Sequence, residues 1–301
     1  MDEREALSRL ASTLPDAGDD CAVVDDRVLT TDMLHETTDF PAGVDRYTAG
    51  WRAVSASLSD VAAMGAAAEA AVAAYAAPAF DPEEVDDFVR GAREVCAAVD
   101  AEYVGGDLDE HGEFTVATTA LGRTDDPVQR GGARPGDAVC VTGTFGRSAA
   151  ALRAFERGDA ASGNELFRFR PRVAAGVALR PHATAMMDSS DGLARSLHQL
   201  VEASDVPDLG MAVEESAVPV DPAVETAFDD PAERREAALF FGEDFELVFT
   251  VPSDEVDAAA AASPTPVSVV GGVDRDGVRM DGEPLPNRGF GHGGGSASDD
   301  R

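Results

Sequence analysis

The sequence predicts an α/β (α+β) fold in two halves. Strand-like and helix-like hydrophobic patterns alternate along most of the 301 residues. Residues 124–137 (TDDPVQRGGARPGD) interrupt this alternation with a polar, turn-rich stretch of two prolines and three glycines. The length suits one large domain or two of medium size, and 44% of the residues are hydrophobic, enough to build a core.

The first half contains helix-like and strand-like segments in alternation. The expected elements are a helix over 3–14, two strands within 19–33 joined by a turn at Asp25-Asp26, a helix over 48–67, a strand over 70–76, a helix over 82–101, and strands over 102–105 and 113–122. The helix from residue 82 is the clearest, because its hydrophobic residues recur every three or four positions. Pro82 suits its first position and Asp81 its N-cap.

The second half repeats this alternation after the turn-rich stretch. The expected elements are strands over 138–144, 183–190, 246–252 and 267–273, and helices over 148–158, 192–204 and 253–262. The small and polar C-terminus predicts disorder. We therefore expect an N-terminal domain over 1–130, a C-terminal α/β domain over 131–290 and a disordered tail over 291–301.

Acidic residues dominate the charge: 57 Asp and Glu stand against 24 basic residues, and the formal net charge is −33. Every basic residue is Arg, and the sequence has no lysine. Such a surface repels nucleic acid and anionic membranes, so neither is an expected partner. A disordered acidic chain is one alternative, but apolar residues are interleaved throughout. We instead expect a soluble protein adapted to molar salt, where the Debye length falls to about 3 Å.

The cysteines, Cys21, Cys96 and Cys140, are far apart and form neither a C-x-x-C pair nor an even disulfide framework. They are expected to be reduced, partly buried thiols. The N-terminal residues lack a signal-peptide core. No run approaches the ~18 apolar residues of a membrane span. We therefore expect a cytoplasmic protein.

Aspartates recur in short motifs of small residues, most of them after an apolar run and before a Gly or Ser turn. They are Asp20, Asp32, Asp60, Asp107, Asp188, Asp191 and Asp244. In a chain this rich in acids each aspartate alone is weak evidence for a functional site, and Asp20 or Asp32 by itself is typical of a turn. As a set, they are the hard oxygen ligands that divalent cations prefer.

Two of these motifs are more specific than the rest. Asp60 lies in an Ala-rich stretch that predicts a buried helix, and a buried carboxylate is costly unless it is paired or binds a metal. The alternative is that Ser59 or Asp60 caps a helix starting there. Asp188 and Asp191 flank a strand-to-helix turn that could bind Mg²⁺ and phosphate. The alternative is a capped helix start with solvated acids.

Several other chemistries lack their motifs. Without lysine, neither a P-loop nor a protein-kinase site can form. The five His have no zinc-like spacing, and no G-x-S-x-G elbow is present. Gly143-Thr-Phe-Gly146, before a predicted helix, resembles a phosphate-binding turn.

Eight motifs follow one another between about residue 16 and residue 291. They are GDDCAVV, LTTDMLHETTDF, SLSDVAAMGA, YVGGD, QRGGARPGD, VTGTFGRSAAAL, MMDSSDGLARSL and GEDFELVFTVP. In this order they resemble the thiamine-monophosphate kinase family, in the aminoimidazole-ribotide synthetase-like superfamily. The resemblance implies a two-domain fold of that superfamily, a homodimer whose N-terminal sheets pair, and ATP between the two halves. It also implies phosphoryl transfer from ATP to thiamine monophosphate, giving thiamine diphosphate and ADP.

The resemblance, carried over position by position, also implies site residues. The implied Mg²⁺ ligands are Asp20, Thr30, Thr31, Asp32, Asp60, Asp107, Asp188 and Asp191. The implied ATP contacts are Gly106, Asp107, Arg130 and Ser190, and the implied substrate contacts are Asp39, Glu243 and Phe290. Asp39 replaces a frequent His, and Leu108-Asp109-Glu110 replaces a T-T-R-like run. Asp244 is left out, because its neighbour Glu243 is the better substrate contact.

The chemistry of these residues agrees with such a reaction. Several Mg²⁺ ions among the carboxylates would let two anionic substrates meet, and K⁺ is a further candidate cation. The acceptor phosphate has a second pKa of about 6 and needs no strong base. Arg130 would cover the ATP phosphates, Glu243 or Asp39 would match the thiazolium cation, and Phe290 would stack on a ring. The alternatives are another ATP-dependent enzyme of the superfamily and a non-catalytic acidic protein that binds cations.

Overall fold

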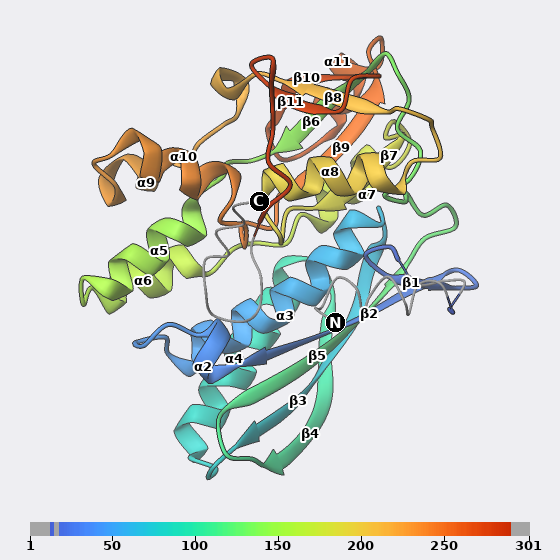
Figure 1. Ribbon diagram of the computed structural model, residues 1–301. Coiled ribbons are helices and arrows are strands. Elements are labelled where there is room, and N and C mark those ends of the chain that lie inside the picture. The colour runs from blue at the N-terminus through green and yellow to red at the C-terminus, as the bar shows by residue number, and fades with distance from the viewer. Residues whose placement is uncertain (1–12, 15–17, 290–301) are drawn as a thin grey trace.

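The structure is a computed structural model that describes residues 13–14 and 18–289. Two sheets, one in each half of the chain, form its framework, and the helix α3 lies between them (Figure 1). The mixed α/β (α+β) class is therefore confirmed. The expected N-terminal helix falls almost wholly outside the described residues, and Phe290 and the expected tail over 291–301 fall wholly outside them.

The N-terminal half is built on a five-stranded sheet in the order β1-β2-β5-β3-β4. The strands are β1 Ala22–Val24, β2 Arg27–His35, β3 Ala67–Ala77, β4 Glu102–Glu110 and β5 Thr115–Arg123. Only β3 and β4 pair in parallel among these neighbours. The predicted turn at Asp25-Asp26 is confirmed: Val24 pairs with Arg27, and Asp25 has a φ of 54°.

Two long helices, α3 (Arg46–Ala63) and α4 (Pro82–Ala98), belong to this half, beside the short α2 (Glu36–Asp39). A Cβ at Gly50 of α3 would come within 2.1 Å of the Phe88 carbonyl oxygen, so the two helices pack closely. The predicted start of α4 is confirmed, with Asp81 accepting hydrogen bonds from backbone amides of the first turn and Pro82 beginning the helix. α3 packs against β2 and β5 on one side and against α7 and β7 of the second half on the other, and nearly all of it is buried.

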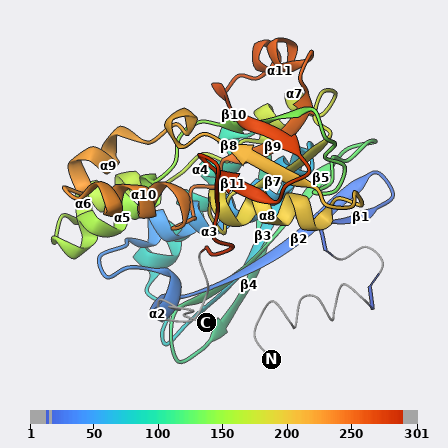
Figure 2. The same cartoon turned by 45° about the horizontal axis from the view of Figure 1, so that its top comes forward.

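The C-terminal half has a seven-stranded sheet in the order β12-β11-β8-β10-β6-β9-β7. Its strands are β6 Asp137–Thr142, β7 Ala185–Asp188, β8 Gly210–Val213, β9 Leu247–Pro252, β10 Val267–Asp274, β11 Val278–Met280 and β12 Glu283–Pro284. Its helices are α5 Arg147–Glu156, α6 Ala160–Phe167, α7 Val173–Leu179, α8 Leu193–Ala203, α9 Pro222–Ala227, α10 Pro231–Leu239 and α11 Val256–Ala262, with the 3₁₀ turn η1 Glu215–Ala217. α8 lies along this sheet (Figure 2). Its Leu193 and Leu197 belong to the same buried cluster as residues of the strands.

The long predicted elements are confirmed within a few residues. The sequence analysis missed short ones, among them α6, α7, β8, α9, α10 and β11, which offer too few turns or alternations to show a period. In the described part of the chain, none of the helices has the length and apolar character that crossing a bilayer requires.

Candidate functional site

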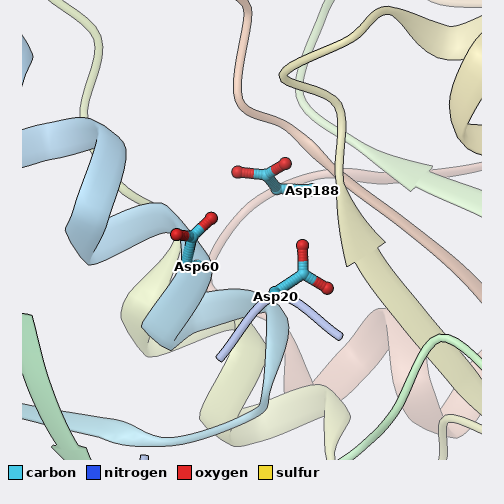
Figure 3. Close-up of side chains that lie close together, drawn as sticks. All are labelled: Asp20, Asp60 and Asp188. Atoms are coloured by element: carbon cyan, nitrogen blue, oxygen red, sulfur yellow. The ribbon is translucent and has the colours of Figure 1, made fainter. Parts of the chain in front are cut away.

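Three aspartates meet where the two halves of the chain pack together (Figure 3). Asp20 precedes β1, Asp60 lies in the last turn of α3, and Asp188 ends β7. One carboxylate oxygen of each lies within 4.8 Å of the others. We call these three residues the junction cluster. The structure thus brings together three of the residues that the sequence selected as metal ligands.

The helix α3 and the strand β2 hold the first-half part of this site. Asp60 lies inside α3, so the alternative that it caps the start of a helix is wrong. Its Oδ2 accepts a 2.6 Å hydrogen bond from the Thr30 hydroxyl. Oδ2 of Asp32 accepts another of 2.6 Å from Ser57 of α3. Because side chains alternate along a strand, Thr30 and Asp32 face α3, and Thr31 faces the other way.

A tight turn fixes Asp188 in the second half. Its side chain is fully buried, and Oδ1 accepts hydrogen bonds from the backbone nitrogen (3.1 Å) and the hydroxyl (2.8 Å) of Ser190. Within the described residues, Oδ2 of Asp188 has no hydrogen-bond partner. Asp191 is not a member of the junction cluster; its Oδ2 accepts from Gln199 at 3.1 Å.

The junction cluster carries more negative charge than its surroundings neutralise. Burial is the largest cause that raises the pKa of Asp60 well above its ordinary value, although this residue keeps some accessible surface, and the charges of Asp32, Asp188 and Asp20 add to it. Burial and then the charge of Asp20 raise the pKa of Asp188 to about 7. A bound cation would relieve both effects.

Arg130 is the cation that contacts the junction cluster. Its Nε and Nη2 donate to the two carboxylate oxygens of Asp20, at 3.1 and 2.8 Å. Burial lowers the pKa of Arg130, but Asp20 and its acidic neighbours raise it further, so the net direction is upward. Asp19 accepts from the backbone nitrogen of Arg130 at 3.0 Å, and burial followed by the charge of Asp20 raises the pKa of Asp19 to about 6.

The predicted residues of the GGD motif lie elsewhere. Gly106 and Asp107 are in β4, an edge strand, and Asp107 is exposed. Asp107 pairs with the exposed Ala74 of β3, which places both side chains on the face of the sheet opposite α3. Thr31 faces the same side. The structure therefore does not bring Thr31, Gly106 and Asp107 together with the junction cluster in one chain.

The predicted substrate contacts lie around Arg52 of α3. Glu243 Oε2 accepts a 2.7 Å hydrogen bond from Arg52. Asp39 accepts from the backbone nitrogen of His35 at 2.7 Å, and its charge acts on Arg52. Phe290 lies outside the described residues. Its neighbour Gly289 is so close to the Asp188–Asp191 turn that a Cβ there would come within 2.0 Å of the Asp191 carbonyl oxygen.

The turn that resembles a phosphate loop is occupied by the protein itself. The Asp244 carboxylate accepts from the backbone nitrogens of Gly146 (2.5 Å) and Ser148 (2.9 Å) at the start of α5. Burial is the main cause that raises the pKa of Asp244 to about 7. An internal carboxylate therefore takes the position that a phosphate would occupy.

Two residues that shape the site, Asp19 and Arg52, were not predicted from the sequence. Arg52 had a usable signal, because it is a charged residue inside a helix of small and apolar residues, eight positions before Asp60. Away from the site, Arg172 forms a partly buried ion pair with Glu246, and no feature of its local sequence indicates this partner.

Comparison with known proteins bears on this geometry. The models of the AIR synthase related protein match in two parts, the N-terminal domain over residues 18–124 and the C-terminal domain over 134–281. The chain is 60% identical to a thiamine-monophosphate kinase of Halobacterium salinarum over 294 residues, which cover 97% of this chain and 100% of the relative. The chain belongs to the thiamine-monophosphate kinase family. The resemblance found in the motifs is thus confirmed.

More distant members of the family agree in length and fold. The thiamine-monophosphate kinase of Methanospirillum hungatei is 39% identical over 303 residues, covering 97% of this chain and 99% of the relative. The solved structure of AaThiL complexed with AMPPCP and TMP has a TM-score of 0.85 at 28% identity, covering 95% of this chain and 96% of that chain. The solved structure of thiamine monophosphate kinase from Aquifex aeolicus has a TM-score of 0.81 at 27% identity, covering 95% of this chain and 99% of that chain.

Proposed function

We propose that this protein transfers the γ-phosphoryl group of ATP to thiamine monophosphate, forming thiamine diphosphate and ADP. The observation that carries the proposal is the 60% identity to a thiamine-monophosphate kinase over the whole length of that relative. The junction cluster supports it, because phosphoryl transfer between two anions needs a site for cations between the halves of the chain. A surface that only collects cations would not need three carboxylates so closely packed and largely buried.

Mg²⁺ fits the residues of the junction cluster. Their oxygens are hard ligands, they repel one another, and Oδ2 of Asp188 has no partner among the described residues. Asp20, Asp60 and Asp188 would hold the ions, with Thr30 and Asp32 beside them. Asp191, one turn further, belongs to the same proposed ligand set. Mg²⁺ bound by these residues would neutralise the phosphate charges and so favour the transfer.

The side chains around the cluster orient and charge the site. Ser190 fixes one oxygen of Asp188 and leaves the other for a ligand, and we propose that it also contacts ATP. Arg130 now pairs with Asp20, and we propose that it contacts the ATP phosphates. The attacking oxygen belongs to the substrate phosphate, whose second pKa is about 6, so it is largely ionised without a general base. Glu243, Asp39 and Phe290 remain the proposed substrate contacts.

We also propose a homodimer formed through the N-terminal sheet. Four large hydrophobic residues of its strands are more than two-fifths exposed: Val24, Leu29, Met33 and Val104. A second copy covering the sheet would remove them from water. Thr31 and Asp107 lie on the outward side of the sheet, and Gly106 lies next to Asp107 on the edge strand β4, so we propose that these residues act on ATP and Mg²⁺ in the dimer rather than within one chain.

The remaining proposals concern domains, location and salt. We place the domain boundary between residues 130 and 131.

The described cysteines are free and buried, which supports a cytoplasmic location. The charge of −33 and the relative from Halobacterium salinarum support adaptation to salt. A salt titration of unfolding tests this adaptation, and full stability in dilute buffer would contradict it.

The activity is tested by following phosphorus NMR signals of ATP, Mg²⁺ and thiamine monophosphate with the protein in molar KCl. The proposal predicts thiamine diphosphate and ADP in equal amounts, and loss of both with excess EDTA. ADP and free phosphate without thiamine diphosphate would contradict it. Replacing KCl by NaCl tests the proposed use of K⁺.

A further inference from the structure

Arg52 is buried at the centre of the molecule, where a charge is costly. Its side chain is 2% exposed, and its guanidinium carbon lies 3.6, 5.4 and 5.7 Å from the ring centroids of Phe167, Phe169 and Phe245. A charge in such surroundings is tolerated only with a close and well-oriented partner. Glu243 is that partner: Nη2 of Arg52 donates to its Oε2 at 2.7 Å and to its carbonyl oxygen at 3.1 Å.

Glu243 is held by its backbone as well as by its side chain. Its φ of 62° lies in the left-handed region, which a non-glycine residue adopts at a cost. The Ser148 hydroxyl donates to its carbonyl oxygen at 2.6 Å. Its own nitrogen donates to the carbonyl oxygen of Ser190 at 2.7 Å. The last bond ties Glu243 to the turn of Asp188, so its position is fixed relative to the junction cluster.

The two oxygens of the Glu243 carboxylate differ in their surroundings. Oε2 accepts from Arg52, whereas among the described residues no donor bonds to Oε1. The side chain is 16% exposed, so a ligand can still reach it. Paired with Arg52, Glu243 presents a directed acceptor and almost no net charge.

We propose that Arg52 is a positioning residue for the acceptor substrate: it orients and neutralises Glu243, so that Oε1 accepts a hydrogen bond from the amino group of the substrate's aminopyrimidine ring. This inference rests on the proposed function. It also changes the role expected for Glu243, because a neutralised carboxylate selects a hydrogen-bond donor and does not balance the thiazolium charge.

The test compares Arg52→Met, Arg52→Lys, Glu243→Gln and the double variant Arg52→Met/Glu243→Gln in molar KCl. Gln at 243 can still accept from Arg52 through its amide oxygen but turns an N–H toward the ligand, which inverts the second hydrogen bond. Arg172→Met is the matched control, because Arg172 pairs with Glu246 three residues further along the same segment. For each variant, the KM values for both substrates, kcat and the melting temperature are measured.

We expect Arg52→Met and Glu243→Gln each to raise the KM for thiamine monophosphate about tenfold or more, with less than about a twofold change in the KM for ATP. The double variant should be no worse than the poorer single one, because Arg52 acts through Glu243. Arg52→Lys should recover part of the loss. Arg172→Met should lower the melting temperature and leave the KM for thiamine monophosphate unchanged.

Calorimetric binding separates this inference from the proposed function, because it needs no turnover. Thiamine monophosphate and a neutral analogue with a thiophene in place of the thiazolium are titrated into wild type and variants. The inference predicts the same loss of affinity for both ligands in the two variants that conserve the net charge of the pair, Arg52→Lys and Arg52→Met/Glu243→Gln, and a loss for both ligands in each of the single variants Arg52→Met and Glu243→Gln. The inference would be overturned if only the cationic ligand lost affinity, or if the effects of the two substitutions added up in the double variant. Equal changes of the KM for thiamine monophosphate in Arg52→Met and Arg172→Met would also overturn it. If Arg52→Met does not fold, Arg52→Lys is compared with Arg172→Lys instead. Equal changes of the KM for thiamine monophosphate in these two variants would then overturn the inference.

Discussion

Buried carboxylates are concentrated in two regions of this protein, and their partners differ. In the segment 243–246 each carboxylate has its own partner. Glu243 has Arg52, Asp244 has the backbone nitrogens at the start of α5, and Glu246 has Arg172 and Thr142. In the junction cluster, Arg130 is the one arginine of the described residues that bonds a carboxylate, that of Asp20, whereas Asp60 and Asp188 accept from the neutral donors Thr30 and Ser190. One oxygen of Asp188 has no partner among the described residues.

This difference separates carboxylates that the protein itself pairs or hydrogen-bonds from those that a bound cation would neutralise. A buried charge that is paired and hydrogen-bonded holds elements together, and removing its partner is destabilising. Buried charges that repel one another weaken the empty fold and are tolerated where a cation binds. Burial alone therefore does not identify the site. The identifying property is the excess of carboxylates over cationic side chains among the described residues.

The largest expected effect is on catalysis by the junction cluster. Asp188→Asn or Asp60→Asn should lower kcat about 100-fold or more at saturating Mg²⁺, the scale of losing one group that stabilises charge in a transition state. Steady-state formation of thiamine diphosphate measures this. Near-normal turnover in either variant would remove that residue from the proposed metal site.

The next effect concerns stability, and it should appear in the paired segment. Glu246→Gln removes the negative charge that pairs with Arg172. Because the Arg172 side chain is 26% exposed, we expect the unfolding free energy to fall by about 2 kcal/mol, near the lower limit for breaking a buried pair. Denaturant unfolding in molar KCl measures it. Asp276→Asn is the control, because Asp276 pairs with Arg279 but is 83% exposed, and its change should stay below about 0.5 kcal/mol. Equal losses in the two variants would contradict the comparison.

A smaller effect concerns the pH dependence of stability. The pKa of Asp244 is about 7 in the fold against an ordinary value of 3.8, so between these values the folded state holds a proton that the unfolded state has released. Its contribution to the unfolding free energy therefore falls as pH rises from about 4 to about 7, by no more than ~1.4 kcal/mol per pH unit. Asp244→Asn should flatten the curve in this window, as unfolding at several pH values would show. An unchanged slope would mean that Asp244 does not hold this proton.

The fold was largely predictable, because hydrophobic residues recur with a regular period in its long helices and strands. Asp81, Pro82 and the repeated apolar residues located α4, and the Asp25-Asp26 turn located the first hairpin. The short elements of the second half escaped, since seven residues such as α7 span only two turns. Their positions are fixed by packing against the seven-stranded sheet and α3, which a local pattern does not record.

The candidate site was predictable in part. The ordered motifs selected Asp20, Asp60 and Asp188, and the structure brings them together. The role of Asp244 could not be read locally, because the amide that it binds at Gly146 is 98 positions away. The outward direction of Asp107 depends on its register with β3, which shifts just before Gly105. Arg52 was overlooked although the stretch around it predicted a buried helix, because its partner Glu243 is 191 positions away.

The most direct test is the stability of wild type and Asp188→Asn with EDTA and with saturating Mg²⁺, at pH 8 in molar KCl. Without Mg²⁺ the variant should be at least as stable as wild type, because a charge that the fold disfavours has been removed. Mg²⁺ should raise the melting temperature of wild type and raise that of the variant much less. A variant that is clearly less stable than wild type in EDTA, and that gains as much from Mg²⁺, would show that the junction cluster is a structural ion-pair site and not a site for cations.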